Sequence, residues 1–340
     1  MTQAISLIPQ PINFTLQSFF ILPLEILGII LESLDTDNIR TLALLSKDMK
    51  KCVYSAIPYV SRLVIRRLLS LDLFPEVWTG VKHLEILWIE ESMNEEMMKM
   101  GLDYVRINWS NLESLVITSN VWRSIGKLSI LHSSNSEKSS YFMPILRMLK
   151  IISDNPFSTL CDSPNLTPNL RILSGFGHIS RLDQYKHLKI LRLHTNALNI
   201  QILNNLNIVE LQLFKVLRCK TIHHKLNSPT LRKLSLICTS SVFIGNLQNL
   251  ESLELYGNIS LKNIVLKNLT NLNLINLESR ISVDILRSAF PNLRYLNTFG
   301  CDESLDPEYP EYSGNIVVSH NYTYVEEYEK ILNRSWEWLS

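Results

Sequence analysis

The residue types that carry out chemistry are scattered along this chain. The five cysteines lie too far apart in the sequence for a zinc knuckle or a redox pair, and we expect reduced, mostly buried thiols: Cys52, Cys161, Cys219, Cys238 and Cys301. His223-His224 has no nearby carboxylate, and Gly175-Phe-Gly177 lacks the third glycine of a dinucleotide-binding loop. No phosphate-binding loop, zinc-protease motif or nucleophile elbow is present. The sequence therefore predicts a non-catalytic protein with no cofactor and no metal.

Composition and charge narrow the classes of partner. Lys and Arg number 33 against 32 Asp and Glu, and this net charge of +1 argues against a polycation that binds nucleic acid. A length of 340 residues, 46% of them hydrophobic and 19% charged, predicts about two folded domains or one elongated array. The apolar run 19–31 is broken by Pro23 and Glu25, is too short to span a membrane, and follows no basic segment. We therefore expect a protein of the cytoplasm or nucleus, neither secreted nor bound to a membrane.

Leucine is in excess, with 58 residues, and it recurs in a pattern. The spacing Leu-x-x-Leu-x-Leu, with Ile allowed, occurs ten times in series, two of the matches lacking the third position. Its first two positions are 84/87, 112/115, 146/149, 170/173, 188/191, 208/211, 231/234, 250/253, 269/272 and 293/296. Each unit is expected to be a short strand with two aliphatic side chains pointing inward, and stacked units would share one leucine core. An asparagine after some of these strands, at 120, 196 and 258, is expected to satisfy the turn.

This series resembles the leucine-rich repeat family over residues 60–300. The resemblance implies an α/β fold, an irregular leucine-rich repeat solenoid in the shape of a horseshoe. A bundle of leucine-rich helices is the alternative. Residues 301–340 carry nine acidic and two basic side chains, and 324–339 have amphipathic helical spacing, so we expect an acidic C-terminal cap on the last repeat, or else a docking peptide.

Residues between and after the inward leucines should face the open side of the sheet, because side chains alternate along a strand. Aromatic residues and arginine are favoured anchors in protein interfaces, so we predict a substrate-binding face from this set: Trp88, Lys150, Phe176, Arg192, His194, Phe214, Tyr256 and Phe299. Two alternatives stay open. The C-terminal segment or a loop covers this face, or its charges are paired with Glu210 and Glu254.

The pattern of residues 20–59 predicts three short helices, and we expect the stretch 1–19 before them to be flexible. Pro23 is a candidate first helical residue, Asp35 to Asp37 are candidate caps of a second helix, and Ser46 or Asp48 of a third. Aliphatic residues recur at helical spacing throughout. Forty residues cannot bury all of them, which implies docking on a partner or on the first repeat.

This segment resembles the F-box. Leu22, Pro23, Glu25, Ile26 and Leu27 match the opening Leu-Pro-x-Glu-Ile/Leu-Leu, and Ser46-Lys47 match the later small-basic pair. A tyrosine, Tyr54 or Tyr59, stands where the family often has a tryptophan. The resemblance implies that these residues bind a Skp-family adaptor: Leu22, Pro23, Leu24, Ile26, Leu27, Ile30, Leu34, Ile39, Leu42 and Leu45. Some of them must instead pack inside the helical unit.

Together the two resemblances imply the substrate receptor of a Skp–cullin–F-box ubiquitin ligase. The adaptor would link the chain to a cullin–RING ligase, and the repeats would bind the protein substrate. Such a subunit needs no catalytic residue, since it raises the concentration of substrate near the conjugating enzyme. The alternatives are a scaffold that holds the adaptor in a non-degradative assembly, for example on chromatin or at a kinetochore, and a repeat protein without F-box function.

Overall fold

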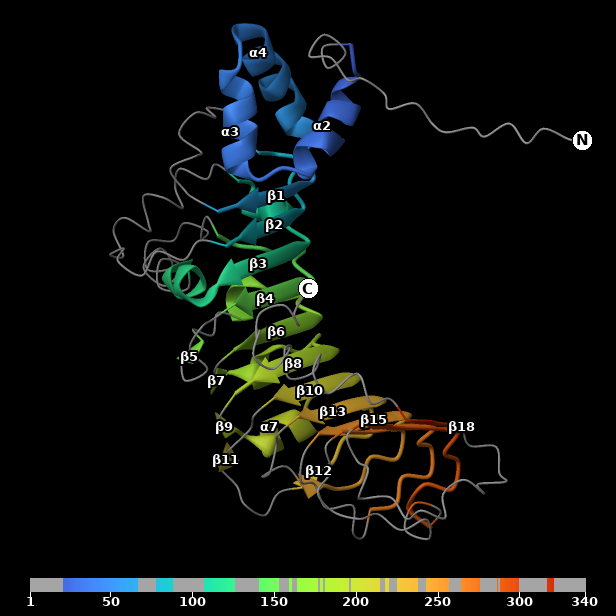
Figure 1. Cartoon of the computed structure of the whole chain (residues 1–340). Helices are drawn as coiled ribbons and strands as arrows, with labels where there is room; N and C mark the ends of the chain where they lie inside the picture. The colour runs from blue at the N-terminus through green and yellow to red at the C-terminus, as the bar shows by residue number, and fades with distance from the viewer. Residues whose placement is uncertain are drawn as a thin grey trace, which may run out of the picture.

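Twelve parallel strands lie side by side in the order in which they occur along the chain, and Figure 1 shows them as a column that runs from the N-terminal helices to β18. The strands of this sheet are β1 (Arg62–Ile65), β2 (His83–Ile86), β3 (Ser114–Thr118), β4 (Met148–Ile152), β6 (Ile172–Phe176), β8 (Ile190–His194), β10 (Glu210–Phe214), β13 (Lys233–Ile237), β15 (Ser252–Tyr256), β16 (Asn271–Ile275), β17 (Tyr295–Phe299) and β18 (Val317–His320). Three two-stranded pairs lie among the connections: β5 (Thr159–Leu160) with β7 (His178–Ile179), β9 (Ala197–Leu198) with β11 (Arg218–Cys219), and β12 (Lys225–Leu226) with β14 (Phe243–Ile244).

The computed structural model describes residues 21–66, 78–87, 107–125, 141–152, 159–160, 164–176, 178–179, 181–195, 197–214, 218–219, 225–237, 243–256, 264–275, 286, 288–299 and 317–320. Its helices include α2 (Leu24–Glu32), α3 (Thr36–Leu44), α4 (Lys47–Ala56) and α7 (Ile200–Asn204), and residues 119–125 after β3 are helical as well. Single 3-10 turns are η1 (Ile57–Tyr59), η3 (Trp109–Asn111), η4 (Pro164–Leu166) and η5 (Leu182–Gln184). The stretch 1–19, predicted to be flexible, and the predicted helix 324–339 both lie outside these ranges.

In the twelve-stranded sheet, the second residue of every strand from β1 to β17 is a leucine, and the pairing register places these leucines next to one another. Leu191 pairs with Leu211, Leu211 with Leu234, and Leu234 with Leu253. All of them are buried, as are most of the aliphatic residues two positions further on. Because adjacent parallel strands lie about 4.8 Å apart, each leucine is covered by the one above and the one below. The strands thus share one core, which no single unit could bury.

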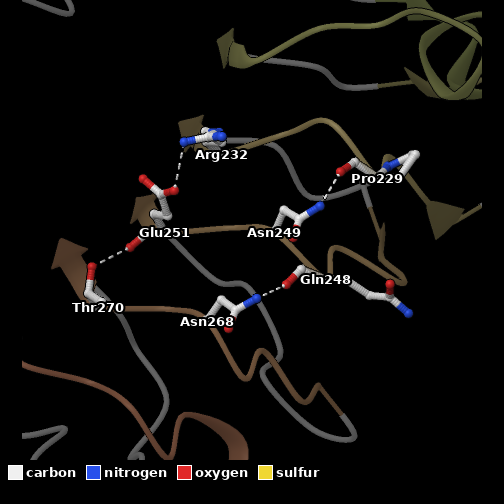
Figure 2. Close-up of polar contacts among 7 residues, drawn as sticks. All are labelled: Pro229, Arg232, Gln248, Asn249, Glu251, Asn268 and Thr270. Carbon is white, nitrogen blue, oxygen red and sulfur yellow. Dashed lines mark hydrogen bonds and ion pairs between the residues drawn. The ribbon is translucent and has the colours of Figure 1, made fainter.

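A second set of contacts joins the turns that precede the strands. The side-chain amide of an asparagine donates to a main-chain carbonyl of the previous turn, for example Asn249 to Pro229 O (2.6 Å) and Asn268 to Gln248 O (2.6 Å) (Figure 2). Asn111, Asn169 and Asn292 do the same with Thr79, Pro144 and Lys267. We call this set the asparagine ladder. Of the asparagines expected to satisfy the turns after the strands, Asn120 is exposed, and 196 and 258 lie outside the described residues.

The N-terminal helices continue the same core. The Asp35 side chain caps α3 by accepting from Asn38 N (2.9 Å), and Ser46 caps α4 by accepting from Met49 N (3.0 Å). Pro23 is the N-cap of α2 rather than its first helical residue. The Glu32 carboxylate at the end of α2 accepts from both the main chain (2.6 Å) and the hydroxyl (2.7 Å) of Ser61, directly before β1. This contact anchors the helices to the first strand.

The fold class predicted from the sequence is wrong. We expected a separate three-helix F-box, a horseshoe of leucine-rich repeats and a C-terminal cap; the structure instead has one continuous all-parallel sheet with few helices among its described residues. The sheet begins next to the helices with β1, which the leucine pattern did not detect, and the helices share its core. At the other end, β18 lies in the predicted cap and pairs with β17 as a further strand.

Replacing Gly28 with alanine should destabilise the N-terminal helices. Alanine normally stabilises a helix interior by about 1 kcal/mol relative to glycine. Here an added Cβ would lie 2.8 Å from Tyr59 Cβ and 3.0 Å from its carbonyl oxygen, so α2 would have to move away from η1. We expect Gly28→Ala to lower the free energy of unfolding by about 1–3 kcal/mol, measured by urea denaturation. Asn38→Ala, an exposed position on α3, is the control and should leave stability unchanged or slightly raised. A Gly28→Ala protein as stable as the control would contradict this close packing.

Candidate protein-binding surfaces

The N-terminal helices expose aliphatic residues in two places. Ile29 on α2 is 61% exposed, and Leu44 and Leu45 between α3 and α4 are 63% and 60% exposed. Ile26 and Ile21 are exposed as well. We call these five residues the helical apolar surface. Large aliphatic side chains in water are unfavourable, by about 1.5–3 kcal/mol each relative to full burial, and groups of them commonly mark a site for a partner.

The structure divides the residues that the F-box resemblance predicted as adaptor contacts. Leu27 and Ile39 are buried in the core and cannot reach a partner. Leu22, Leu24, Ile30, Leu34 and Leu42 are partly buried and pack against that core. Pro23, Ile26 and Leu45 are exposed. Only the last group is free to contact another protein without a rearrangement.

Ile29 and Leu44 were missed by the sequence reasoning. The signal for them was present, because α2 is apolar on all sides: its sequence LEILGIILE contains six aliphatic residues. A helix on a surface can bury only one face, so some of these residues had to remain exposed. Which face is buried depends on how α2 packs against α4 and η1, and the sequence does not contain that information.

Apart from Trp88, the predicted substrate-binding residues occupy the third or fifth position of their strands, which form two rows across the sheet. The inner row contains the third residue of each strand, and register places Lys150, Ser174, Arg192 and Gln212 side by side. The outer row contains the fifth residue of each strand, where register joins Phe176, His194, Phe214, Ile237, Tyr256, Ile275 and Phe299. The backbone of the sheet thus aligns in one row residues that span 123 positions of the chain, from Phe176 to Phe299.

The two rows are unevenly exposed. In the outer row His194, Phe214 and Tyr256 are half-buried and each already makes a contact within the chain, whereas Ile237 is fully buried. The side chains of Phe176 and Phe299 lie outside the described set, although their backbones belong to β6 and β17. In the inner row Ser174 and Ser235 are buried, and the Ser235 hydroxyl has no hydrogen-bond partner.

Trp88 is placed differently from the prediction. We had aligned Leu84, Leu87 and Ile89 with the leucines of later strands, but Leu84 and Ile86 are the residues that pair with Leu115 and Ile117. The inner-row residue of β2 is therefore Glu85, and Trp88 itself lies outside the described residues. The error arose because Leu84 fits both the first and the second leucine of the motif.

The charges on this face are partly paired. The Arg192 guanidinium donates to one carboxylate oxygen of Glu210 through Nε (3.2 Å) and Nη2 (2.9 Å). Glu254 likewise has a partner within the chain. The alternative in which the charges of this face are paired with Glu210 is therefore confirmed for Arg192. Arg192 thus offers less unpaired positive charge to a substrate than a free arginine would.

Lys150 is buried on β4, with 8% of its surface exposed. Desolvation lowers the pKa of its amine from the usual 10.5, and the negative charge of Glu85, two strands away, partly opposes this shift. Burial of the Lys150 amine therefore lowers the stability of the folded protein. The side chain is not exposed for contact with a substrate.

No known protein family has a sequence pattern that matches this chain, and no curated protein is significantly similar to it. Among the described residues, no three His, Cys, Asp or Glu side chains are grouped to hold a metal ion. None of the helices within the ranges given above is long and apolar enough to cross a membrane.

Lys150→Met should stabilise the protein at neutral pH. Between the lowered pKa of Lys150 and 10.5, the unfolded state binds more protons than the folded state, so the stability of the wild type rises with pH across this window. Methionine removes the desolvation cost, and we expect a gain of about 1 kcal/mol or more at pH 7. The gain should shrink as pH approaches 10.5. Urea denaturation of both proteins at pH 7, 9 and 10.5 tests this, and a gain independent of pH would contradict a desolvated amine.

Proposed function

We propose that this protein is the substrate-recognition subunit of a Skp–cullin–F-box ubiquitin ligase. In this proposal the N-terminal helices bind a Skp-family adaptor, which links the chain to a cullin–RING ligase. The open face of the sheet binds the protein to be ubiquitinated. The chain itself is not an enzyme, and it acts in the cytoplasm or nucleus.

The observation that carries the proposal is the helical apolar surface. It lies on the segment that contains Leu22, Pro23, Glu25, Ile26 and Leu27, the residues of the F-box-like opening. Aliphatic anchors on short helices suit an interface in which helices lie in an apolar groove of a partner. Exposed aliphatic side chains in an isolated chain are typical of a subunit whose partner covers them in the complex.

The role proposed for the sheet follows from its shape. A helix-docking partner would cover only one end of the column, because α2, α3 and α4 lie beside β1 (Figure 1). The strands from β3 to β17 then remain available to a second protein. Two partners held on one rigid sheet are kept close together, which raises the effective concentration of substrate near a ligase bound to the adaptor.

Ile29→Glu combined with Leu44→Glu should abolish adaptor binding. Both side chains are exposed, so the charged replacements should not disturb the core but would place carboxylates in an apolar groove. We expect at least a hundredfold loss of affinity for a purified Skp-family adaptor, measured by co-purification and isothermal titration calorimetry. Val265→Glu is the matched control, since Val265 is a similarly exposed aliphatic residue far from the helices, and it should bind as the wild type does.

Two outcomes would contradict this proposal. If the wild type does not bind the adaptor, the helices only cover the end of the sheet and the protein has no F-box function. If the double variant binds as tightly as the Val265→Glu control, the helical apolar surface is not the adaptor site. A melting temperature within about 2 °C of the wild type is required of each variant, so that loss of binding is not loss of fold.

Removal of the protein from cells should raise the level of its substrate. A ligase receptor shortens the lifetime of the protein that it binds, and a proteasome inhibitor should abolish the difference between depleted and undepleted cells. Quantitative proteomics with re-expression of the wild type or the Ile29→Glu, Leu44→Glu variant measures this, and only the wild type should restore degradation. Adaptor binding without any such change would favour the non-degradative scaffold.

A further inference from the structure

One residue directly before each strand forms a row along the edge at which the parallel strands begin. We call it the leading row, and from β2 to β17 it consists of Lys82, Glu113, Arg147, Arg171, Lys189, Val209, Arg232, Glu251, Thr270 and Arg294. Main-chain hydrogen bonds join successive members, for example Arg171 N to Arg147 O (2.9 Å) and Lys189 N to Arg171 O (2.8 Å). The row is therefore held at the strand spacing of about 4.8 Å, and its side chains stand beside one another.

Charges along the leading row are balanced except at its centre. Lys82 pairs with Glu113 (3.4 Å), and Arg232 pairs with Glu251 (3.2 Å; Figure 2). Between these pairs, three exposed cations stand on consecutive strands: Arg147, Arg171 and Lys189. Among the described residues, the two arginine side chains make no hydrogen bond or ion pair, and Lys189 only donates weakly to Asn207 O (3.4 Å). Three neighbouring cations repel one another until an anion binds between them.

Two of these cations, Arg147 and Arg171, line a pocket of about 270 Å³ together with Pro144, Ile145, Asn169 and His187. The pocket lies at the turns before β4, β6 and β8, where the asparagine ladder is only partly kept. Asn169, before β6, donates to Pro144 O (2.8 Å) like the other ladder residues. The equivalent positions before β4 and β8 are Ile145 and His187, and within the described chain His187 makes no hydrogen bond.

The lining of the pocket selects the chemistry of a ligand. Two guanidinium groups, an imidazole and an amide face it, and none of the lining residues is acidic. Arginine forks bind the oxygens of a phosphate in pairs, and a phosphate monoester carries close to two negative charges at pH 7. Ile145, which also lines the pocket, is exposed and provides an apolar wall beside the charges.

We propose that this pocket binds a phosphorylated side chain of a partner protein. The run of cations is bounded by Glu113 on one side and Val209 on the other, so it is only three strands long. A run of this length matches a compact dianion, whereas a nucleic acid or a membrane surface presents many negative charges over a larger area. The apolar wall would take the residue next to the phosphate. The proposal does not depend on adaptor binding, because the pocket is formed by turns of the sheet and not by the helices.

Binding of phosphopeptides to the full-length protein tests the proposal. The probe is a fluorescent pool of nine-residue peptides with a central phosphothreonine and randomised flanks, compared by anisotropy with the same pool carrying threonine. We expect the phosphorylated pool to bind at least tenfold more tightly. Arg147→Ala with Arg171→Ala should remove this preference, whereas Arg294→Ala, at the same position before β17, should keep it.

A further variant separates binding from folding. His187→Asn supplies the amide that the asparagine ladder lacks at this turn, so its melting temperature should be equal or higher while the preference for phosphopeptide falls several-fold. Equal binding of the two pools would overturn the proposal, and so would a preference that survives in the double arginine variant. Tighter binding to single-stranded RNA or to vesicles rich in phosphatidylserine than to the phosphorylated pool would also overturn it. None of these results bears on the adaptor, which is measured separately.

Discussion

The whole structure depends on the pairing of leucines between neighbouring strands. Each strand of the main sheet has only four or five residues, and most of them contribute two aliphatic side chains to the interior. No strand can bury these side chains alone, so the stability of any one depends on the strand before and the strand after it. Register follows from the same constraint, since a shift of one residue would turn every leucine toward the open face.

An array of this kind has two ends, and each would expose a row of leucines and an unpaired strand. The N-terminal helices solve this problem at β1, where Glu32 is hydrogen-bonded to Ser61 and Asp35 to Arg66 through an ion pair of 3.1 Å. Covering the strand uses one side of the helices and leaves Ile29, Leu44 and Leu45 in solvent. The same packing that protects the sheet therefore produces the surface that we assign to the adaptor.

The turns before the strands show how a regular array acquires a local site. Where asparagine recurs, its amide closes each turn against the previous one, and the carbonyls of the backbone are satisfied. Ile145 and His187 stand in place of asparagine before β4 and β8, and Arg147 and Arg171 beside them have no carboxylate of the kind that pairs with Arg232. Departures from the repeat are thus more informative about binding than the repeat itself.

The sequence by itself determined where most strands lie and which of their residues are buried, because the spacing of the leucines follows directly from the alternation of side chains along a strand. It also identified Asp35 and Ser46 as caps and Glu210 as a candidate partner of Arg192, since these are local relations or relations between equivalent positions of neighbouring strands. It did not determine the fold class. Val60 occupies the first position of the unit at β1, and the aliphatic residues of β18 are valines, so the leucine spacing does not reveal that one sheet continues at both ends. Only the tertiary structure decided which side of α2 is buried, that Lys150 is desolvated, and that Arg147, Arg171 and His187 surround one pocket. Burial and charge at these residues depend on paired strands 18 to 34 positions away in the chain, and no local pattern encodes which side chains those strands supply.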